Sequence, residues 1–156
     1  EYWTGDCFIM NISNIDHIGI RITEKRAALD FYEILGFQLE QEVDFDAVII
    51  MKNKSGVEIN LINNGQDISN GKNILMDVPE KHPGFTHVAF GVESVLHVME
   101  VLEKNNIPIS QGPVTFGRDG HVSIFIRDPD RNTIELRGRV EDESKIPGLT
   151  FYDPKG

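Results

Sequence analysis

The feature of this sequence that most limits its fold is an internal repeat. Residues 15–22 (IDHIGIRI) and residues 85–92 (FTHVAFGV) share one pattern, in which a histidine is followed by apolar residues at the first, third and fifth positions. That alternation predicts a strand with one buried face. His17 and His87 then lie on the opposite face of their strands. Since a repeated segment is typical of a repeated structural unit, the sequence predicts two similar modules in tandem.

Each repeat continues with the pattern of a helix and three more strands. Apolar residues recur at helical spacing after each first strand; they are Ala28, Leu29, Phe31, Tyr32 and Leu35, then Val95, Val98, Met99 and Leu102. The strands expected after the helices span roughly residues 37–43, 47–52 and 57–62, then 109–115, 122–127 and 133–137. The sequence therefore predicts the α+β class, with two tandem βαβββ modules forming a curved sheet around a central cleft and both helices on the outside.

The chain is expected to divide into five parts. These are an N-terminal segment at residues 1–11, a first module at 12–64, a linker at 65–84, a second module at 85–139 and a C-terminal tail at 140–156. The linker is recognised by its Asn, Gly, Asp and Pro residues. The tail is polar apart from four residues, and either packing on the body or a role as a lid fits that composition.

Composition excludes several classes of function. The formal net charge is −10, which disfavours a nucleic-acid binder and an anionic membrane surface, since both select clustered Lys and Arg. The single cysteine, Cys7, excludes an intrachain disulfide and fits a reducing compartment. No apolar run approaches the ~20 residues of a membrane span, and the first residues lack the pattern of a signal peptide. We therefore expect a cytoplasmic protein.

The last strand of each module carries the chemistry. Alternation in residues 57–62 (VEINLI) places Glu58 opposite the apolar face, and in residues 133–137 (TIELR) it does the same for Glu135. Each module thus offers one His from its first strand and one Glu from its last. If the modules face each other, His17, Glu58, His87 and Glu135 converge on one divalent cation. Two imidazoles and two carboxylates suit Ni, Zn, Co, Mn or Fe(II); a site that has lost its metal is the alternative.

Four further residues are candidates for substrate binding. Arg21 shares the face of His17, where it could bind an anion or remain a surface residue. His121 and Phe125 alternate on the strand next to Glu135, and His121 could serve as an acid or base or lie at the rim. Arg137 follows Glu135 on the same face and could neutralise that carboxylate or the substrate.

These motifs resemble those of the vicinal oxygen chelate superfamily. The resemblance rests on DHIGI and THVAF around the histidines, VEI and DPDRNTIEL around the glutamates, and the helix text ALDFYEILGF, and it covers about residues 15–139. The superfamily includes glyoxalase I, methylmalonyl-CoA epimerase, extradiol dioxygenases, fosfomycin-resistance transferases and metal-free bleomycin-binding proteins. The resemblance is specific for the fold and much less so for the reaction.

Within the superfamily the sequence is most similar to glyoxalase I. That similarity implies one divalent metal held by His17, Glu58, His87 and Glu135, with the two glutamates as catalytic carboxylates. It implies a lyase of the lactoylglutathione type, which isomerises a small substrate with vicinal oxygens through a metal-chelated enediolate. Arg21 matches an Arg that binds a glutathione carboxylate. The sequence departs from the pattern at Ile62, Thr115 and Arg131, and it leaves a homodimer open.

Three alternative functions remain at this point. An epimerase acting on an acyl thioester would use the same ligands for proton transfer. An extradiol dioxygenase needs three metal ligands and a Tyr where this chain has Phe125, so the fourth ligand, Glu58, counts against it. A drug-binding resistance protein would hold no metal and would have a cleft lined by aromatic residues.

Overall fold

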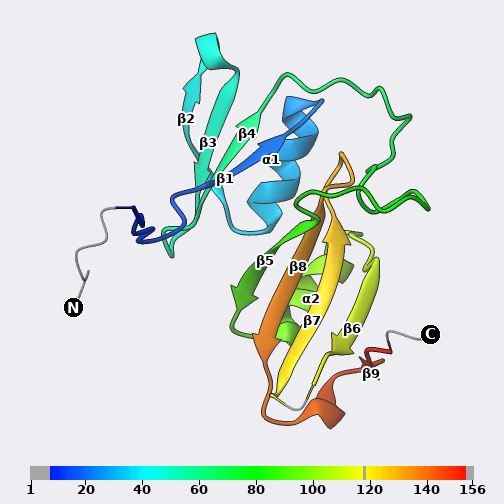
Figure 1. Cartoon of the computed structure of the whole chain (residues 1–156). Coiled ribbons are helices and arrows are strands. Elements are labelled where there is room, and N and C mark those ends of the chain that lie inside the picture. Colours follow the sequence, from blue (N-terminus) through cyan, green and yellow to red (C-terminus); the bar gives the residue numbers. More distant parts are fainter. Residues whose placement is uncertain (1–7, 118, 154–156) are drawn as a thin grey trace.

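The computed structural model describes residues 8–117 and 119–153 and contains two modules joined by a linker (Figure 1). The first module comprises β1 (Ile18–Arg21), α1 (Lys25–Ile34), β2 (Gln38–Val43), β3 (Val48–Lys52) and β4 (Glu58–Ile62). A short 3₁₀ helix (Asp44–Asp46) joins β2 to β3. The sheet has the order β1-β4-β3-β2, in which only the β1–β4 pair is parallel. Cys7 and the first part of the predicted N-terminal segment lie outside the described residues.

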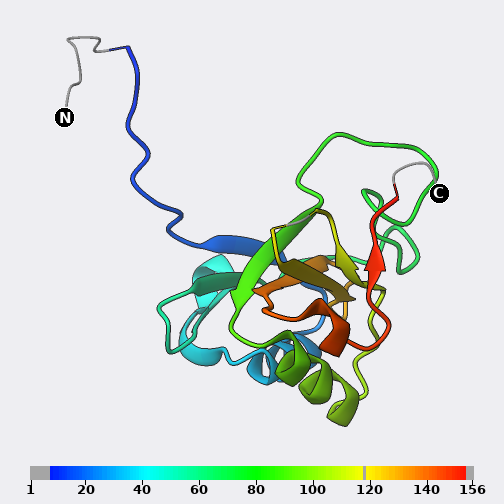
Figure 2. The same cartoon turned by 90° about the horizontal axis from the view of Figure 1, so that it is seen from below.

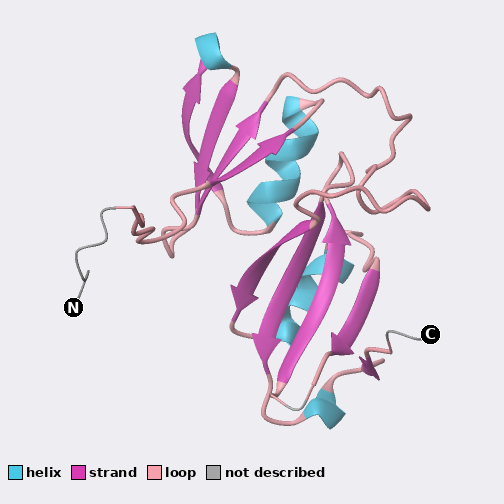
Figure 3. Ribbon diagram, in the orientation of Figure 1, coloured by secondary structure: helices cyan, strands magenta, loops and turns pink. Residues whose placement is uncertain are grey.

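The second module repeats this order of elements (Figure 3). It comprises β5 (His87–Val92), α2 (Val95–Lys104), β6 (Gln111–Thr115), β7 (His121–Arg127) and β8 (Thr133–Arg139). The tail adds a 3₁₀ helix (Glu143–Lys145) and a short strand, β9 (Thr150–Phe151), giving the order β5-β8-β7-β6-β9. The predicted α+β class and the two βαβββ modules are confirmed, and the strands form two mixed sheets, one in each module.

Local signals explain where the elements begin and end. The Glu24 carboxylate accepts hydrogen bonds from the backbone N–H groups of Arg26 and Ala27 and so caps α1, and Ser94 caps α2 in the same way. Ala47 adopts a left-handed conformation, so β3 begins one residue later than predicted. Each helix has ten residues, and no helix in the described part of the chain is long and apolar enough to cross a membrane.

The C-terminal tail packs on the second module. Thr150 and Phe151 pair in parallel with Val114 and Thr115 of β6. The Tyr152 backbone N–H donates to the Thr115 carbonyl at 2.9 Å. Of the two roles that the sequence left open for the tail, packing on the body is the one observed.

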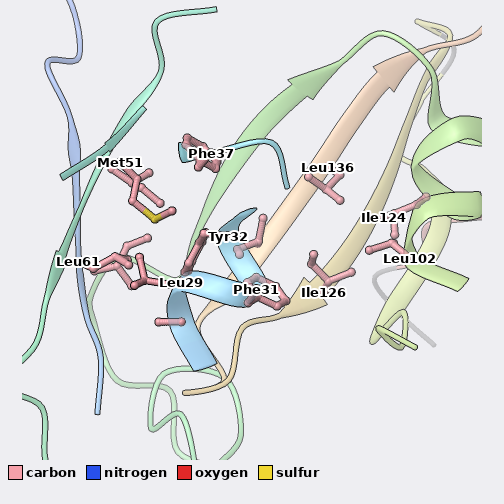
Figure 4. Close-up of a cluster of buried hydrophobic side chains, with 14 of the residues drawn as sticks. Leu29, Phe31, Tyr32, Phe37, Met51, Leu61, Leu102, Ile124, Ile126 and Leu136 are labelled. Atoms are coloured by element: carbon pink, nitrogen blue, oxygen red, sulfur yellow. The ribbon is translucent and has the colours of Figure 1, made fainter. Parts of the chain in front are cut away.

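Helix α1 lies between the two modules, which corrects the expectation that both helices would be on the outside. Leu29 packs with Met51 and Leu61 of its own sheet, while Phe31 and Tyr32 lie toward Ile126 of the other module (Figure 4). The buried side chains of both modules form one hydrophobic cluster. The reason is that α1 buries four apolar side chains. Some of them pack on the sheet of the first module and others on the second module, so the helix contacts two surfaces at once.

A buried hydrogen bond fixes this packing. The Tyr32 hydroxyl donates to Asp128 Oδ2 at 2.7 Å, and the same carboxylate accepts from the backbone N–H groups of Asp130 and Asn132 and from the Asn132 amide. Burial raises the pKa of Asp128, and burial together with the Asp128 charge raises the pKa of Tyr32 well above its usual value. The neighbouring Asp130 accepts from the Thr23 hydroxyl and backbone N–H of the first module. The β7–β8 turn is therefore bound to α1 near both of its ends, through Thr23 just before the helix and Tyr32 close to its C-terminal end.

We predict that replacing Tyr32 with Phe destabilises the protein by about 1–3 kcal/mol, because Asp128 stays buried and loses one donor. The free energy of unfolding in urea measures this effect. Tyr152→Phe is the control, because Tyr152 is half exposed. Equal losses in the two variants would contradict the role of the hydrogen bond.

A second set of contacts ties the linker to the second module. The Asp77 carboxylate receives two hydrogen bonds from the Arg131 guanidinium, at 2.7 and 3.0 Å, and one ion pair from Arg127 at 3.0 Å. Arg131 has a φ of 63°, a left-handed conformation that explains why a Gly is usual at this position. Its bidentate bond to Asp77 offsets that strain. The hydrogen bonds from Arg131, followed by the hydrogen bond from the Asn73 backbone N–H and then by the charge of Arg127, hold the pKa of Asp77 well below its usual range.

We predict that Asp77→Asn lowers the free energy of unfolding at neutral pH. A depressed pKa in the folded state adds stability above the pKa of an unfolded Asp, about 3.9, and this stability is lost as the pH falls toward the folded pKa. The difference between wild type and variant should therefore be complete above about pH 5 and shrink below about pH 4. Denaturant unfolding at a series of pH values measures it. Asp46→Asn, which removes an exposed charge, is expected to show no such pH dependence.

Candidate metal centre

The first pair of predicted ligands meets at the edge of the first sheet. The β1–β4 register aligns Ile18 with Ile59 and so places His17 beside Glu58. His17 Nδ1 lies 3.8 Å from Glu58 Oε2 and 2.6 Å from Asp16 Oδ1. With its amide nitrogen oriented toward Glu58, Asn60 donates to Glu58 Oε2 at 3.1 Å and accepts from His17 Nε2 at 3.2 Å. We call His17 and Glu58 the first half-site.

A lysine also contacts this half-site. Lys52 lies opposite Glu58 in the β3–β4 register, and its Nζ is 3.5 Å from Glu58 Oε1 and 3.3 Å from Glu40 Oε1. The hydrogen bond to Glu40 is the largest cause that raises the pKa of Lys52. Glu58 therefore has an exposed cationic neighbour.

The second pair meets on the open face of the second sheet. His87 Nε2 lies 3.2 Å from Glu135 Oε1, and the Ser123 hydroxyl donates to Glu135 Oε2 at 3.0 Å. The β5–β8 register aligns Glu135 with Ala89, two residues beyond His87, so the small Ala89 leaves room for the imidazole to reach forward. Glu135 is only 7% exposed. We call His87 and Glu135 the second half-site.

The spacing within each pair fits metal ligation. Two ligand atoms at about 2.0–2.2 Å from one divalent ion lie about 3.0–3.5 Å apart in tetrahedral or octahedral geometry. The pairs at 3.2 and 3.8 Å are close to that spacing. At the second half-site the other ring nitrogen, His87 Nδ1, lies 2.8 Å from the Thr86 hydroxyl, a neighbour of the kind that orients a metal-bound imidazole. At the first half-site the same nitrogen, His17 Nδ1, faces both Asp16 and Glu58.

The structure does not bring the two half-sites together in one chain. Over the described ranges, 8–117 and 119–153, the only group of three or more potential ligands with mutually close atoms is Asp16, His17 and Glu58. The beginnings of β1 and β5, where the two histidines lie, are apart in both Figure 1 and Figure 2. The four-residue metal site therefore remains a prediction.

The predicted substrate-binding residues divide between the two sheets. Arg21 is exposed, and its Nε donates to the Asn64 side chain at 3.0 Å. On the second sheet, Asp119 Oδ2 lies 2.9 Å from His121 Nδ1 and accepts from Arg137 at 3.1 Å. The hydrogen bond from the His121 backbone N–H is the largest cause that lowers the pKa of Asp119. His121 and Arg137 thus form one polar group around Asp119, at the rim of the second half-site.

A row of aromatic rings extends from the second half-site. The ring of Phe125 lies 5.7 Å from the ring of His87 and 6.5 Å from that of Phe116. Phe116 in turn lies 4.9 Å from Tyr152 of the tail. Phe125 is buried, whereas Phe116 and Tyr152 are about half exposed. We call Phe125, Phe116 and Tyr152 the aromatic row.

Some of these neighbours escaped sequence reasoning. Lys52 and Asp119 were not singled out as site residues. Alternation along residues 48–52 puts Lys52 on the side opposite the buried Met51, but nothing local indicates that it pairs with Glu58. Thr115, which stands where many glyoxalases have Lys, is fully buried, and its hydroxyl donates to the Gly117 carbonyl. It therefore has no access to a substrate.

A groove also lies away from both half-sites. It has a volume of about 640 Å³ and lies at the end of α1, where Leu39, Glu40, Lys52 and Lys54 line it. It contains none of the four predicted ligands.

Comparisons with known proteins show which family the sequence matches. A family model described as the glyoxalase/bleomycin resistance protein/dioxygenase superfamily matches residues 14–136. A glyoxalase domain-containing protein, RDO1, from Mycosarcoma maydis is 30% identical over 132 residues, which cover 81% of this chain and 69% of that protein.

Solved structures show the same fold. A glyoxalase/dioxygenase from Nostoc punctiforme superposes with a TM-score of 0.67 at 22% identity, covering 84% of this chain and 94% of that one. A virulence protein from Salmonella typhimurium superposes with a TM-score of 0.61 at 27% identity, covering 84% of this chain and all of that one.

We predict that Ser123→Ala weakens the binding of Ni or Zn about tenfold, because a hydrogen bond that orients a ligand carboxylate is lost. Isothermal titration with the metal measures the change in Kd. Ser55→Ala, at an exposed turn, is the control and should leave the Kd unchanged. A Ser123 variant with wild-type affinity would mean that Glu135 needs no such support.

Proposed function

The chain belongs to the glyoxalase/bleomycin resistance protein/dioxygenase superfamily, and we propose that it is a divalent-metal-dependent isomerase or lyase of the glyoxalase type. Lactoylglutathione lyase activity is the leading reaction. The observation that carries this proposal is the pair of His and Glu side chains in each module, set at ligand spacing on the face away from the core.

Four side chains would hold the metal: His17, Glu58, His87 and Glu135. When bound, a metal of the Ni, Zn, Co, Mn or Fe(II) group supplies a Lewis acid for two neighbouring oxygens of the substrate. The protein's contribution is to fix the donors. Asp16 and Thr86 contact the Nδ1 atoms of the histidines, and Ser123 holds Glu135.

The two glutamates differ in their freedom to move a proton. Glu135 is buried and bonded to Ser123, so it is the fixed carboxylate. Glu58 is more exposed and has Lys52 beside it, which can stabilise the carboxylate in more than one position. We assign Glu58 as the general base that carries a proton between adjacent substrate carbons. Arg21, on the face of His17 and bonded to a neutral amide, is available to an anionic group of the substrate.

The complete site is proposed to form between two chains. One chain holds its half-sites on separate sheets, and the contacts of Tyr32 and Thr23 with the β7–β8 turn fix the modules in that arrangement. The residues two positions before the histidines, Ile15 and Phe85, are 82% and 99% exposed. Apolar side chains so exposed beside both half-sites are typical of a surface that is covered in an assembly. A twofold dimer that joins the first half-site of one copy to the second half-site of the other would form two such sites. It would cover Ile15 and Phe85 in both copies.

A metal-free binding protein is the second candidate, and the aromatic row favours it. Phe116 and Tyr152 are about half exposed, so their rings are accessible to a flat drug-like molecule, with the buried Phe125 beside Phe116. Metal analysis of the purified protein separates the two functions. A ring-cleaving dioxygenase is less well supported, because Phe125 has no hydroxyl and packs against His87.

The reaction is tested with protein loaded with Ni or Zn. Isomerisation of a hemithioacetal is the expected result, and Glu58→Gln should abolish it. Epimerisation of an acyl thioester would keep the reaction class and change the substrate. Oxygen uptake with catechols by the Fe(II)-loaded protein would overturn the proposal.

We predict that mixing two inactive variants restores metal sites. The His17→Ala chain lacks an intact first half-site, and the His87→Ala chain lacks an intact second half-site. In a mixed dimer the first half-site of the His87→Ala chain meets the second half-site of the His17→Ala chain, so one of the two sites is complete. Unfolding and refolding equal amounts together should give about a quarter of the wild-type number of sites, by random pairing. Bound Ni per chain measures it, and each variant refolded alone is the control. Full loss in the mixture would place all four ligands within a single chain.

A further inference from the structure

The segment that leads into His17 is an exposed apolar arm. Residues 8–16 extend away from the body and make no helix or strand (Figure 2). Phe8, Ile9, Met10, Ile12 and Ile15 are 62–90% exposed. Apolar side chains scattered singly on a surface are ordinary, but five within eight consecutive residues on a projecting segment are typical of a segment that docks. We call residues 8–16 the arm.

The position of His17 limits where the arm can lie. If His17 shares a metal with His87 and Glu135 of a second copy, the three ligand atoms lie within about 4 Å of one another. An extended chain advances about 3.3 Å per residue, so Ile15 is about 7 Å and Ile12 about 17 Å from His17 along the arm. The end of the arm next to His17 therefore lies within about 10 Å of the partner's second half-site, close enough to contact that module.

That surface of the second module is apolar as well. The aromatic row leads away from His87 in ring-to-ring steps of 5.7, 6.5 and 4.9 Å, through Phe125 and Phe116 to Tyr152. Its outer members are about half exposed, and the adjacent Phe151 is 71% exposed. The row and the arm thus begin at the same metal site and have similar lengths.

We propose that the arm of each copy docks on the aromatic row of a second copy, with Ile12 and Ile15 packed against Phe116. This inference rests on the proposed metal site between two chains. The arm then forms one wall of the substrate cavity, because it covers the second half-site from outside. It also excludes water from the proposed metal site during proton transfer by Glu58.

The proposal is tested with Ile12→Ser, and Ile68→Ser is the matched control. Ile68 is 89% exposed and lies in the linker, away from the arm. In sedimentation equilibrium with Ni present, Ile12→Ser should raise the dimer dissociation constant about tenfold, since a buried Ile side chain is exposed. Ile68→Ser should leave it unchanged. Because the arm projects from the body, the variant is expected to keep the unfolding midpoint of the module cores.

The contact itself is tested with Phe116→Ser and with the double variant. If Ile12 and Phe116 touch across the dimer, the double variant should dissociate little more readily than either single one. Hydrogen exchange in residues 114–117 should also become faster in Ile12→Ser. Additive effects, or unchanged exchange there, would overturn the docking of the arm.

These outcomes separate the arm from the metal site. If the protein binds Ni as a dimer and Ile12→Ser leaves the dimer dissociation constant unchanged, the proposed function stands and the docking of the arm is wrong. A protein that binds Ni as a monomer contradicts the shared site, and the docking of the arm fails with it.

Discussion

The hydrogen bond from the Tyr32 hydroxyl to Asp128 is the interaction on which the arrangement of this molecule depends. It joins residues 96 positions apart and lies inside the cluster that both modules share. The carboxylate of Asp128 also organises its own turn through Asp130 and Asn132. One buried acid therefore shapes the β7–β8 turn and attaches it to α1, and a rotation of the modules would remove the donor that the first module supplies to that acid.

The position of α1 has a direct consequence for the chemistry. Because the helix fills the space between the modules, the faces that carry the ligands are turned away from that shared core. His17 and His87 therefore remain partly exposed, with the apolar residues Ile15 and Phe85 beside them. A chain built in this way keeps a stable core and leaves both halves of its site on surfaces that a second copy can cover. In the proposed centre, each chain supplies two pairs of ligands, and assembly of two copies brings the pairs together.

Sequence reasoning succeeded where the physical signal is local. Alternation of apolar and polar side chains has the period of a strand, so it located most strands and the face on which each His and Glu lies. It could not find Tyr32 with Asp128, or Asp77 with Arg131, because such pairs depend on tertiary packing and leave no periodic trace. The placement of α1 failed for the same reason. The helical stripe was recognised, but its second contact surface belongs to another module.

The register of the parallel strands shows how two repeats of similar sequence come to differ. In the first module His17 lies level with Glu58, whereas in the second Glu135 lies level with Ala89, two residues past His87. The shift draws Glu135 into a buried position, where Ser123 can bond to it, while Glu58 stays near the rim with Lys52. A buried, hydrogen-bonded carboxylate loses little further freedom when it binds a cation, and an exposed one must still be ordered. The second half-site is therefore the preorganised part of the proposed centre, and the first is the part that can adapt to the metal and the substrate.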